Sequence, residues 1–209
     1  MPKDNRGDDS GQGPERILSF WFGAVGEGGL SSEETASRWW KKDLAFDELL
    51  RERFAHDHAA ILRGERDEWL STACGRLAYV IVLDQFSRNM FRDTPGMFAH
   101  DELALRAALE GIELGMDQAV KGDLRAFYYL PLMHSEDLDV QDRCVDLFRA
   151  LVDAVGEEQR ARFENNLKYA IAHRDIVARW GRFPHRNAIL GRESSTEELV
   201  FLQQPGSSF

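Results

Sequence analysis

Cysteine is scarce in this sequence, which bears on both disulfides and metal sites. Only two of the 209 residues are cysteines. Cys74 and Cys144 lie far apart inside helix-like patterns, and neither belongs to a CxxC or CxxxC pair. Disulfide-bonded domains and thiolate zinc sites need more cysteines at closer spacing. The sequence therefore argues against a disulfide framework, and we predict no metal site and no cofactor.

Long hydrophobic runs are also missing. The longest is LAYVIVL, Leu77 to Leu83, whereas a membrane-spanning helix needs roughly 20 apolar residues. Residues 1–13 are polar and glycine-rich, without the apolar stretch of a secretory signal. We predict a disordered lead-in over residues 1–13, no membrane partner and a cytoplasmic location.

Positive charge is in the minority. The chain has 26 Lys and Arg against 36 Asp and Glu, which gives a formal net charge of -10. A nucleic-acid surface needs Lys and Arg clustered over a broad face to neutralise phosphates. We therefore predict no nucleic-acid partner, although a small basic pocket is compatible with this charge.

Strand patterns are rare, and apolar residues recur mostly every three or four positions. This spacing is typical of amphipathic helices and predicts an all-α protein. Because 43% of its residues are hydrophobic, the chain can bury a sizeable core, which predicts a single domain over residues 14–209. Short connections favour antiparallel hairpins, arranged as a bundle or an α-solenoid. We expect eight or nine helices, at about residues 14–23, 31–40, 43–64, 67–91, 94–115, 124–134, 137–156, 157–180 and 195–202.

Several of these helices have capping residues at their starts. Ser31 with Glu34, and Ser195 with Glu198, have the spacing of a capping box. Asp43 precedes a long apolar stripe and is a good N-cap residue. We therefore expect helices to begin directly after Ser31, Asp43 and Ser195.

The expected helix at 67–91 ends in VLDQFSRNMFR, which brings charge onto a buried stripe. Asp84 falls on the inward face, and Arg88 lies one turn further along the same face, so we expect the two to pair. Gln85 and Asn89 form a second couple at the same spacing. Either these residues lock the helix in place by an internal salt bridge, or they belong to a polar site.

A helix that contains a proline leads into the motif HSED. Because Pro131 frees a backbone carbonyl, His134, Glu136 and Asp137 emerge at a chain reversal where side chains converge. The acids also have a simpler interpretation, in which one caps the next helix and the others favour its N-terminal dipole. That interpretation leaves His134 unexplained.

The expected helix at 157–180 carries a histidine on its apolar face. His173 shares a stripe with Tyr169, Ile176 and Trp180 at spacings of three and four residues. A lone histidine in such a place is usually a hydrogen-bonded core residue. Here the same helix leads directly into a basic segment.

This basic segment, residues 182–192, reads RFPHRNAILGR and has three arginines and a histidine but no carboxylate. Its arginines either pair with the acids of HSED and with Asp84, or hold a carboxylate or phosphate in two-point contact. The two arrangements can occur together if the protein's acids orient the arginines and a ligand binds the N–H groups that remain free. The polar candidates here are Arg182, His185, Arg186 and Asn187.

The chain resembles the bacterial family called domain of unknown function 924 in four successive motifs. They read LDQFSRNMFR, YYLPLMHSED, HRDIVARWGRFPHRNAILGR and FLQQPGSSF. The resemblance spans about residues 15–209, with the motifs in the same order. It implies the packed helical hairpins of a tetratricopeptide-repeat-like (TPR-like) α-α superhelix. It implies no activity and no catalytic residues.

Three functional hypotheses account for these motifs. The first is a binding module with an internal Arg/His/Asn/Asp site for a small anionic ligand or a peptide carboxylate. A second hypothesis assigns the motifs to a structural salt-bridge network. The candidates for ligand binding are Arg88, Asn89, Glu136, Arg182, His185, Arg186 and Asn187.

The third hypothesis is a hydrolase-type enzyme. It uses a histidine as acid or base, an aspartate that orients the histidine, and arginine that stabilises developing negative charge. No GxSxG, P-loop or HExxH motif occurs in the chain. The candidates for catalysis are His134, His173, His185 and Asp84.

Overall fold

A computed structural model describes residues 13–208, and the predicted lead-in lies outside these residues except for Gly13. The described part contains helices and no strands, which confirms the all-α prediction. None of its helices has the length and apolar character that a membrane crossing requires. The α-helices are α1 (Pro14–Phe22), α2 (Glu33–Trp39), α3 (Leu44–Leu62), α4 (Ala73–Ile81), α5 (Ser87–Met90), α6 (Asp101–Glu113), α7 (Gly122–Met133), α8 (Leu138–Ala154), α9 (Glu157–Trp180) and α10 (Thr196–Phe201).

Helix starts follow the capping predictions at two of three positions. The Asp43 carboxylate accepts hydrogen bonds from the first turn of α3, and Ser195 forms a capping box with Glu198 at α10. The prediction for α2 is wrong by one residue, because Ser32 rather than Ser31 provides the capping oxygen. Ser31 is buried and its backbone N–H instead donates to a carboxylate at the start of α7.

The helix expected at residues 67–91 is divided into shorter pieces. A 3-10 turn covers Asp67–Ser71, and the extended backbone of Thr72 interrupts the chain before α4. A π-helical turn, Val82–Phe86, then joins α4 to α5. The helix expected at 94–115 is similarly divided into a 3-10 turn and α6, so the described residues have ten α-helices instead of eight or nine. A π turn adds a residue to the turn and therefore changes which side chains share a face.

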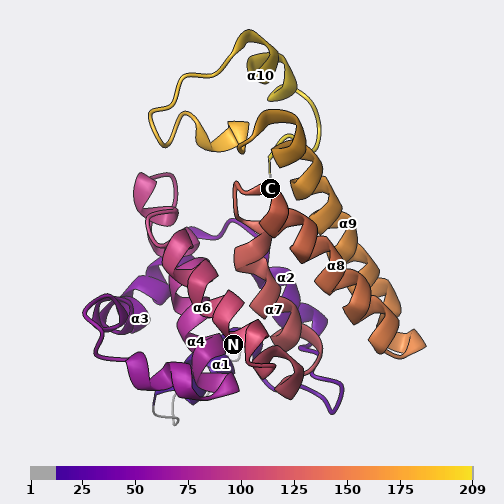
Figure 1. Ribbon diagram of the computed structural model, residues 1–209. Helices are drawn as coiled ribbons and strands as arrows, with labels where there is room; N and C mark the ends of the chain where they lie inside the picture. Colours follow the sequence, from indigo (N-terminus) through magenta and orange to yellow (C-terminus); the bar gives the residue numbers. More distant parts are fainter. Residues whose placement is uncertain (1–12, 209) are drawn as a thin grey trace, which may run out of the picture.

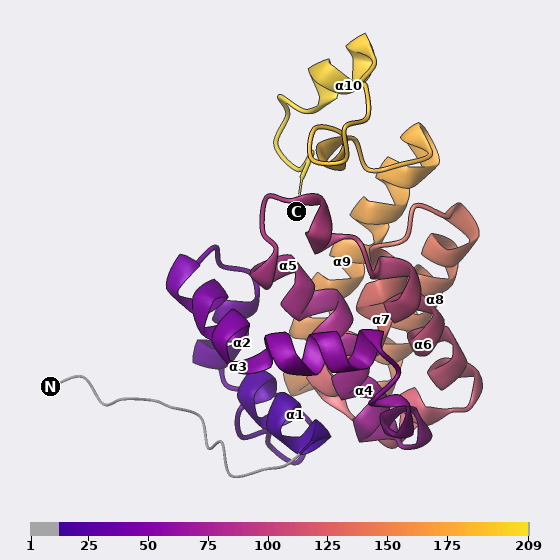
Figure 2. The same ribbon diagram turned by 90° about the vertical axis from the view of Figure 1, so that its left-hand side faces the viewer.

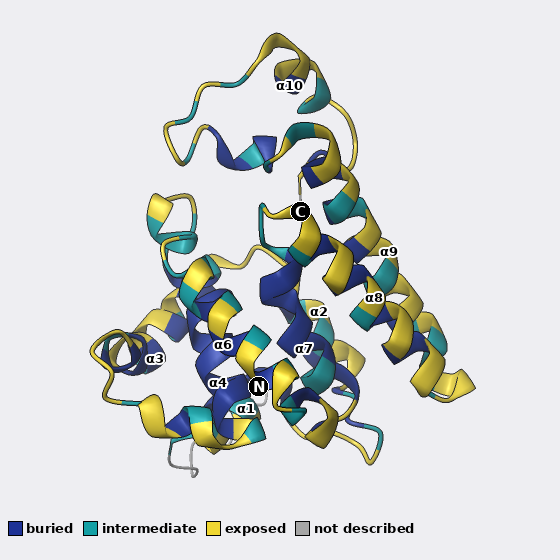
Figure 3. Cartoon of the chain, viewed as in Figure 1, coloured by how far each residue is buried: buried dark blue, intermediate teal, exposed yellow. Residues whose placement is uncertain are grey.

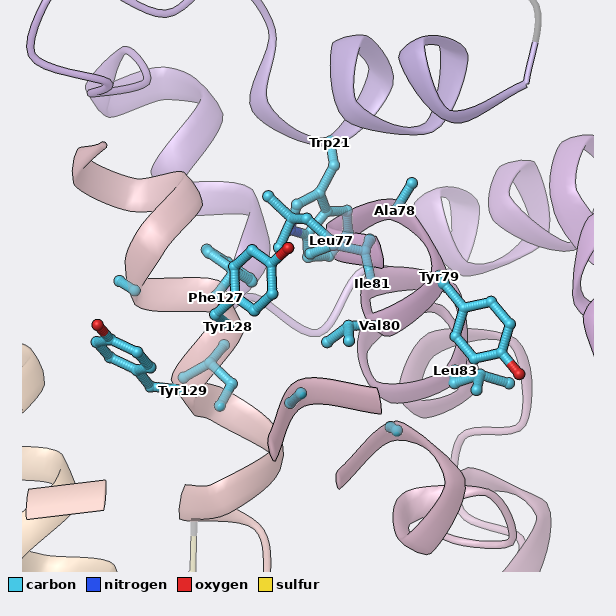
Figure 4. Packing of buried hydrophobic residues seen from close by; sticks show 14 of the residues in the cluster. Trp21, Leu77, Ala78, Tyr79, Val80, Ile81, Leu83, Phe127, Tyr128 and Tyr129 are labelled. Carbon is cyan, nitrogen blue, oxygen red and sulfur yellow. The ribbon is translucent and has the colours of Figure 1, made fainter. Parts of the chain in front are cut away.

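The central helix of the fold is α4, which packs against α1, α6 and α7. Consecutive helices α6 to α9 also pack against one another, and α8 and α9 lie side by side along one flank (Figure 1). Figure 3 shows that α4 and α7 are largely buried. Trp21 of α1, Leu77 of α4 and Phe127 of α7 meet in the core (Figure 4), where the rings of Trp21 and Phe127 are 6.0 Å apart, edge to face.

The chain after α9, residues 182–208, forms the C-terminal segment. It begins beyond Gly181, which closes α9 in the left-handed conformation at φ 65°. Figures 1 and 2 both place α10 and its flanking loops at one end of the molecule, beyond the C-terminal end of α9. Here Phe183 joins a small hydrophobic cluster of its own, separate from the main core, with Ile176, Val177, Trp180 and Phe201.

Candidate functional site

Asp84 lies in the π turn at the centre of the predicted polar site. Its side chain is completely buried, and its Oδ1 is 2.7 Å from Nδ1 of His134 and 3.0 Å from Nη1 of Arg88. The predicted pair between Asp84 and Arg88 is thus confirmed. The predicted couple of Gln85 and Asn89 is wrong, because Gln85 donates to Oδ2 of Asp84 at 2.6 Å and Asn89 faces another helix.

The charges around Asp84 decide its protonation state. Burial by itself would raise the pKa of Asp84, but the charge of Arg88 and the hydrogen bonds from His134 and Gln85 hold it well below the usual range. Burial and the charge of Arg88 lower the pKa of His134. A neutral His134 with its Nδ1 hydrogen directed at Asp84 leaves Nε2 as an acceptor at neutral pH.

Asp101, at the start of α6, joins this site although the sequence analysis missed it. Arg88 donates to both oxygens of Asp101, at 2.8 and 2.9 Å. Arg186 approaches the same carboxylate at 3.3 Å and donates its other terminal nitrogen to the backbone oxygen of His134 at 2.9 Å. The only sequence signal was an acid in the first turn of a helix, which the helix dipole alone explains.

Arg186 is the most enclosed arginine of the C-terminal segment. Only 7% of it is exposed, and its guanidinium carbon lies 4.6 Å from the ring centre of Phe98 and 4.5 Å from that of Phe183. Burial and the nearby charge of Arg88 lower its pKa to about 10. Its Nε has no hydrogen-bond partner among residues 13–208. This arginine is therefore stacked on aromatic rings but incompletely paired.

Three histidines gather around Phe183. The rings of His134 and His173 are 6.3 Å apart, and Phe183 lies 5.6 Å from both His173 and His185. Burial and His134 lower the pKa of His173 to about 3, and burial and Arg186 lower that of His185 to about 4. The structure therefore brings the three histidine candidates for catalysis close together, and all three are neutral at pH 7. Nδ1 of His173 lies 2.8 Å from the backbone oxygen of Tyr169.

Glu136 links the body of the fold to the C-terminal segment. Its carboxylate accepts two hydrogen bonds from Arg192, at 2.6 and 2.9 Å, and one from the backbone N–H of Phe183 at 2.8 Å. Burial would raise the pKa of Glu136, but the hydrogen bond from Arg192 lowers it. The carboxylate thus serves as a partner for the protein's own donors.

Arg182 and Asn187 lie within the C-terminal segment but pair there internally. Arg182 donates to both oxygens of Glu198, at 2.7 and 2.8 Å, and this contact lowers the pKa of Glu198 to about 2. Asn187 donates to Ser194 at 3.0 Å and to Glu198 at 3.5 Å. Both residues hold α10 in place.

Asn89 lies in a different group of polar residues. Its amide donates to Asp47 of α3 at 2.8 Å, and Arg92 holds the same carboxylate in two-point contact at 2.6 and 2.8 Å. Of the predicted ligand-binding residues, Arg88 and Arg186 therefore lie at Asp84 and His134. We call Asp84, Arg88, Asp101, His134 and Arg186 the central cluster.

Comparison with known proteins places the chain in a family. A family model described as "Bacterial protein of unknown function (DUF924)" matches residues 17–206. The chain belongs to this family. A similar solved structure, of the protein of unknown function ATU0120 from Agrobacterium tumefaciens, is 43% identical, and the match covers 91% of this chain and 96% of that chain at a TM-score of 0.76. A search of curated proteins found no match.

The central cluster of this DUF924 protein contains charged groups of both signs. Two arginines face two carboxylates and a neutral histidine, so the cluster is close to electroneutral. Within residues 13–208, no group of three or more His, Cys, Asp or Glu side chains could hold a metal ion. A surface cavity of about 190 Å³ lies along α6, and its lining contains none of the cluster's residues: Glu102, Leu105, Arg106, Leu109, Glu110 and Glu113.

Proposed function

We propose that this DUF924 protein is a binding module for a small anionic ligand or a peptide carboxylate, with Arg186 as the main anchor. One observation carries the proposal. The guanidinium of Arg186 is buried, its Nε lacks a partner in the described part of the chain, and its contact with Asp101 is a single one at 3.3 Å. A buried donor without an acceptor costs free energy that a bound anion would recover.

The charge at Arg186 supports an anion as the missing partner. Asp101 already accepts two shorter hydrogen bonds from Arg88, so it compensates Arg186 only in part. The lowered pKa of Arg186, about 10, has the same cause, because burial and Arg88 outweigh the carboxylates nearby. An anion placed at Nε supplies the missing acceptor and brings a negative charge that Arg186 does not share with Arg88.

Further polar atoms near Arg186 in the sequence support this location. Nε1 of Trp180, Oδ1 of Asn187 and Nε of Arg192 are buried and have no hydrogen-bond partner in the described residues. Protein interiors leave few such atoms, and each one needs an explanation. Their concentration around the start of the C-terminal segment supports a surface that a ligand completes.

The test compares two arginines of the same segment. Arg186→Lys keeps the charge but removes the planar fork, whereas Arg182→Lys alters an arginine that is paired with Glu198. Acetate, benzoate, phosphate and sulfate are titrated at constant ionic strength by calorimetry and thermal shift. We expect at least one anion to bind wild type and Arg182→Lys, with at least tenfold weaker binding to Arg186→Lys, about 1.4 kcal/mol.

Two results would contradict the binding proposal. If no anion binds wild type, or if binding survives Arg186→Lys unchanged, Arg186 is not an anchor. A large loss of stability in Arg186→Lys that no anion restores would instead favour the structural salt-bridge network. Circular dichroism establishes that both variants are folded before the titrations are compared.

A hydrolase is the second candidate, because one contact favours it. The hydrogen bond of 2.7 Å between Asp84 and His134 has the geometry that orients a histidine general base. A panel of small esters, amides and phosphate esters provides the test, with His134→Gln and the exposed His56→Gln as a matched pair. Turnover lost only in His134→Gln supports the enzyme, and turnover retained in both rules out this role for His134.

Finer features of the fold and setting are part of the same proposal. The sequential packing of α6 on α7, α7 on α8 and α8 on α9 supports TPR-like helical hairpins. The net charge of -10 supports a partner other than nucleic acid. We also propose a cytoplasmic location.

A further inference from the structure

We infer that the anion bound at Arg186 is a planar carboxylate attached to an apolar or aromatic group, rather than a tetrahedral phosphate or sulfate. This inference rests on the proposed anion-binding function and specifies its ligand. It is drawn from the rings around Arg186, from the part of its guanidinium that is unoccupied, and from the carboxylates next to it.

Aromatic rings cover the guanidinium of Arg186. The ring centres of Phe98 and Phe183 lie 4.6 and 4.5 Å from its central carbon, and both rings come from outside the central cluster. Rings this close to the guanidinium carbon limit the space around it. We therefore place the ligand at the edge of the guanidinium, where its N–H groups point.

One nitrogen of that edge lacks a hydrogen-bond partner. Nη1 of Arg186 faces Asp101 and Nη2 donates to the backbone oxygen of His134, whereas Nε has no partner in the described chain. A carboxylate is flat and can lie in the guanidinium plane, with one oxygen at Nε, between the flanking rings. A tetrahedral phosphate or sulfate carries oxygens out of the guanidinium plane, so it needs more space beside the two nearby rings.

The charges nearby favour a single negative charge. The carboxylates of Asp84 and Asp101 belong to the same cluster, and both repel an incoming anion. Arg186 shares Asp101 with Arg88 and contacts it only once, at 3.3 Å, so its own charge is compensated only in part. A monoanion matches that deficit, whereas a dianion brings an excess of negative charge beside two buried acids.

The walls around Arg186 suit an apolar group on the ligand. Phe98 is half-buried, so its ring is partly accessible, while Phe183 is buried and lies 5.6 Å from the rings of His173 and His185. The lowered pKa values of these histidines keep them uncharged at neutral pH. An aromatic or aliphatic carboxylate can therefore place its body against uncharged rings while its head reaches Arg186.

Ligand entry requires the C-terminal segment to shift, because Nε of Arg186 is buried. The segment contacts the rest of the fold here through polar groups, with Glu136 bound to Arg192 and to the backbone of Phe183. Its apolar contacts are instead with the end of α9. Such an arrangement lets the segment tilt at Gly181 without opening the main core.

The experiment uses two ligands that share a ring and a charge but differ in the head. Benzoate and benzenesulfonate share a phenyl ring and a charge of one, but the first head is planar and the second tetrahedral. Calorimetry with full-length wild type at constant ionic strength should show at least tenfold tighter binding of benzoate. Phenylphosphonate, measured above its second pKa, adds a dianion with the same ring and should bind no better than benzenesulfonate.

A variant at one ring tests the cause of this selectivity. Phe98→Leu removes a half-buried ring while it keeps an apolar side chain, so it should narrow the preference for benzoate by at least threefold. Equal or tighter binding of benzenesulfonate to wild type would overturn the inference, yet leave the proposed function standing if Arg186→Lys weakens that binding. Absence of binding by every anion would remove the proposed function and this inference together. If Phe98→Leu does not fold, the wild-type comparison decides the question.

Discussion

Arg88 and Arg186 share the carboxylate of Asp101, but the two residues are compensated to different degrees. Burial opposes the charge of both, yet Asp84 and Asp101 together raise the pKa of Arg88 above its usual value. Burial and the charge of Arg88 lower the pKa of Arg186 to about 10, and its one longer, shared contact with Asp101 does not offset them. We therefore assign Arg88 mainly to holding the fold and Arg186 to ligand binding.

Asp84 is the residue on which the central cluster most depends. We predict that Asp84→Asn lowers the free energy of unfolding by about 3 kcal/mol, because removing one partner of a buried ion pair leaves the other charge uncompensated. Asp142→Asn is the control, since Asp142 pairs with Arg174 at the surface and should cost less than about 1 kcal/mol. Urea denaturation at pH 7 measures both, and equal losses would contradict a central role for Asp84.

At the scale of the element, the junction between α9 and the C-terminal segment contains the buried histidines. The folded state keeps His173 and His185 neutral, with pKa values of about 3 and 4. Unfolded histidine has a pKa near 6.5 and takes up a proton first as the pH falls. The contribution of these residues to stability is thus complete above pH 6.5 and is lost progressively between pH 6.5 and their folded pKa values.

We predict that the free energy of unfolding falls between pH 6.5 and pH 4, by up to about 3 kcal/mol for each of these two histidines. Urea denaturation at a series of pH values measures this slope. His185→Gln should reduce the slope, whereas the exposed His56→Gln should leave it unchanged. His58, whose pKa burial and His100 lower to about 4, contributes to the slope in all these proteins. A slope unaffected by His185→Gln would contradict the assignment.

Helices and most of their caps could be predicted from the sequence, because these features depend on neighbouring residues. Asp43 and Ser195 cap helices as expected, and α9 ends at Gly181 as expected. The π turn at Val82–Phe86 could not be predicted, since it occurs inside an almost uniformly apolar run. The wrong couple of Gln85 and Asn89 is a direct result, because it assumed an unbroken α-helix.

At the scale of the whole molecule, the site depends on contacts that no local pattern reveals. The sequence predicted the pair of Asp84 and Arg88 from helical spacing. The other polar residues pair with acids that are distant in the chain. Arg186 pairs with Asp101, Arg182 with Glu198 and Asn89 with Asp47. The chain has many acids, and tertiary packing determines which of them lies next to each arginine or asparagine. The spacing of residues in the sequence therefore could not show which polar residues belong to the central cluster.

The molecule as a whole consists of a large apolar core and a small apolar cluster at the end of α9, with the central cluster at their junction. This arrangement makes the junction the least apolar contact between two parts of the fold. Polar contacts can exchange one anionic partner for another at lower cost than a packed core can rearrange. An anion bound at the central cluster, as we propose, would therefore influence the position of the C-terminal segment relative to the rest of the fold.

The most direct test of the binding role of Arg186 observes its own Nε–H. An NMR titration of uniformly 15N-labelled protein with benzoate follows the arginine Nε–H signals, which are assigned with Arg186→Lys and Arg182→Lys. We predict a saturable shift of the Arg186 signal and no comparable shift for Arg182, which Glu198 already holds in two-point contact. An Arg186 signal that does not respond, or that changes only in proportion to added salt, would contradict the claim that this residue binds an anion.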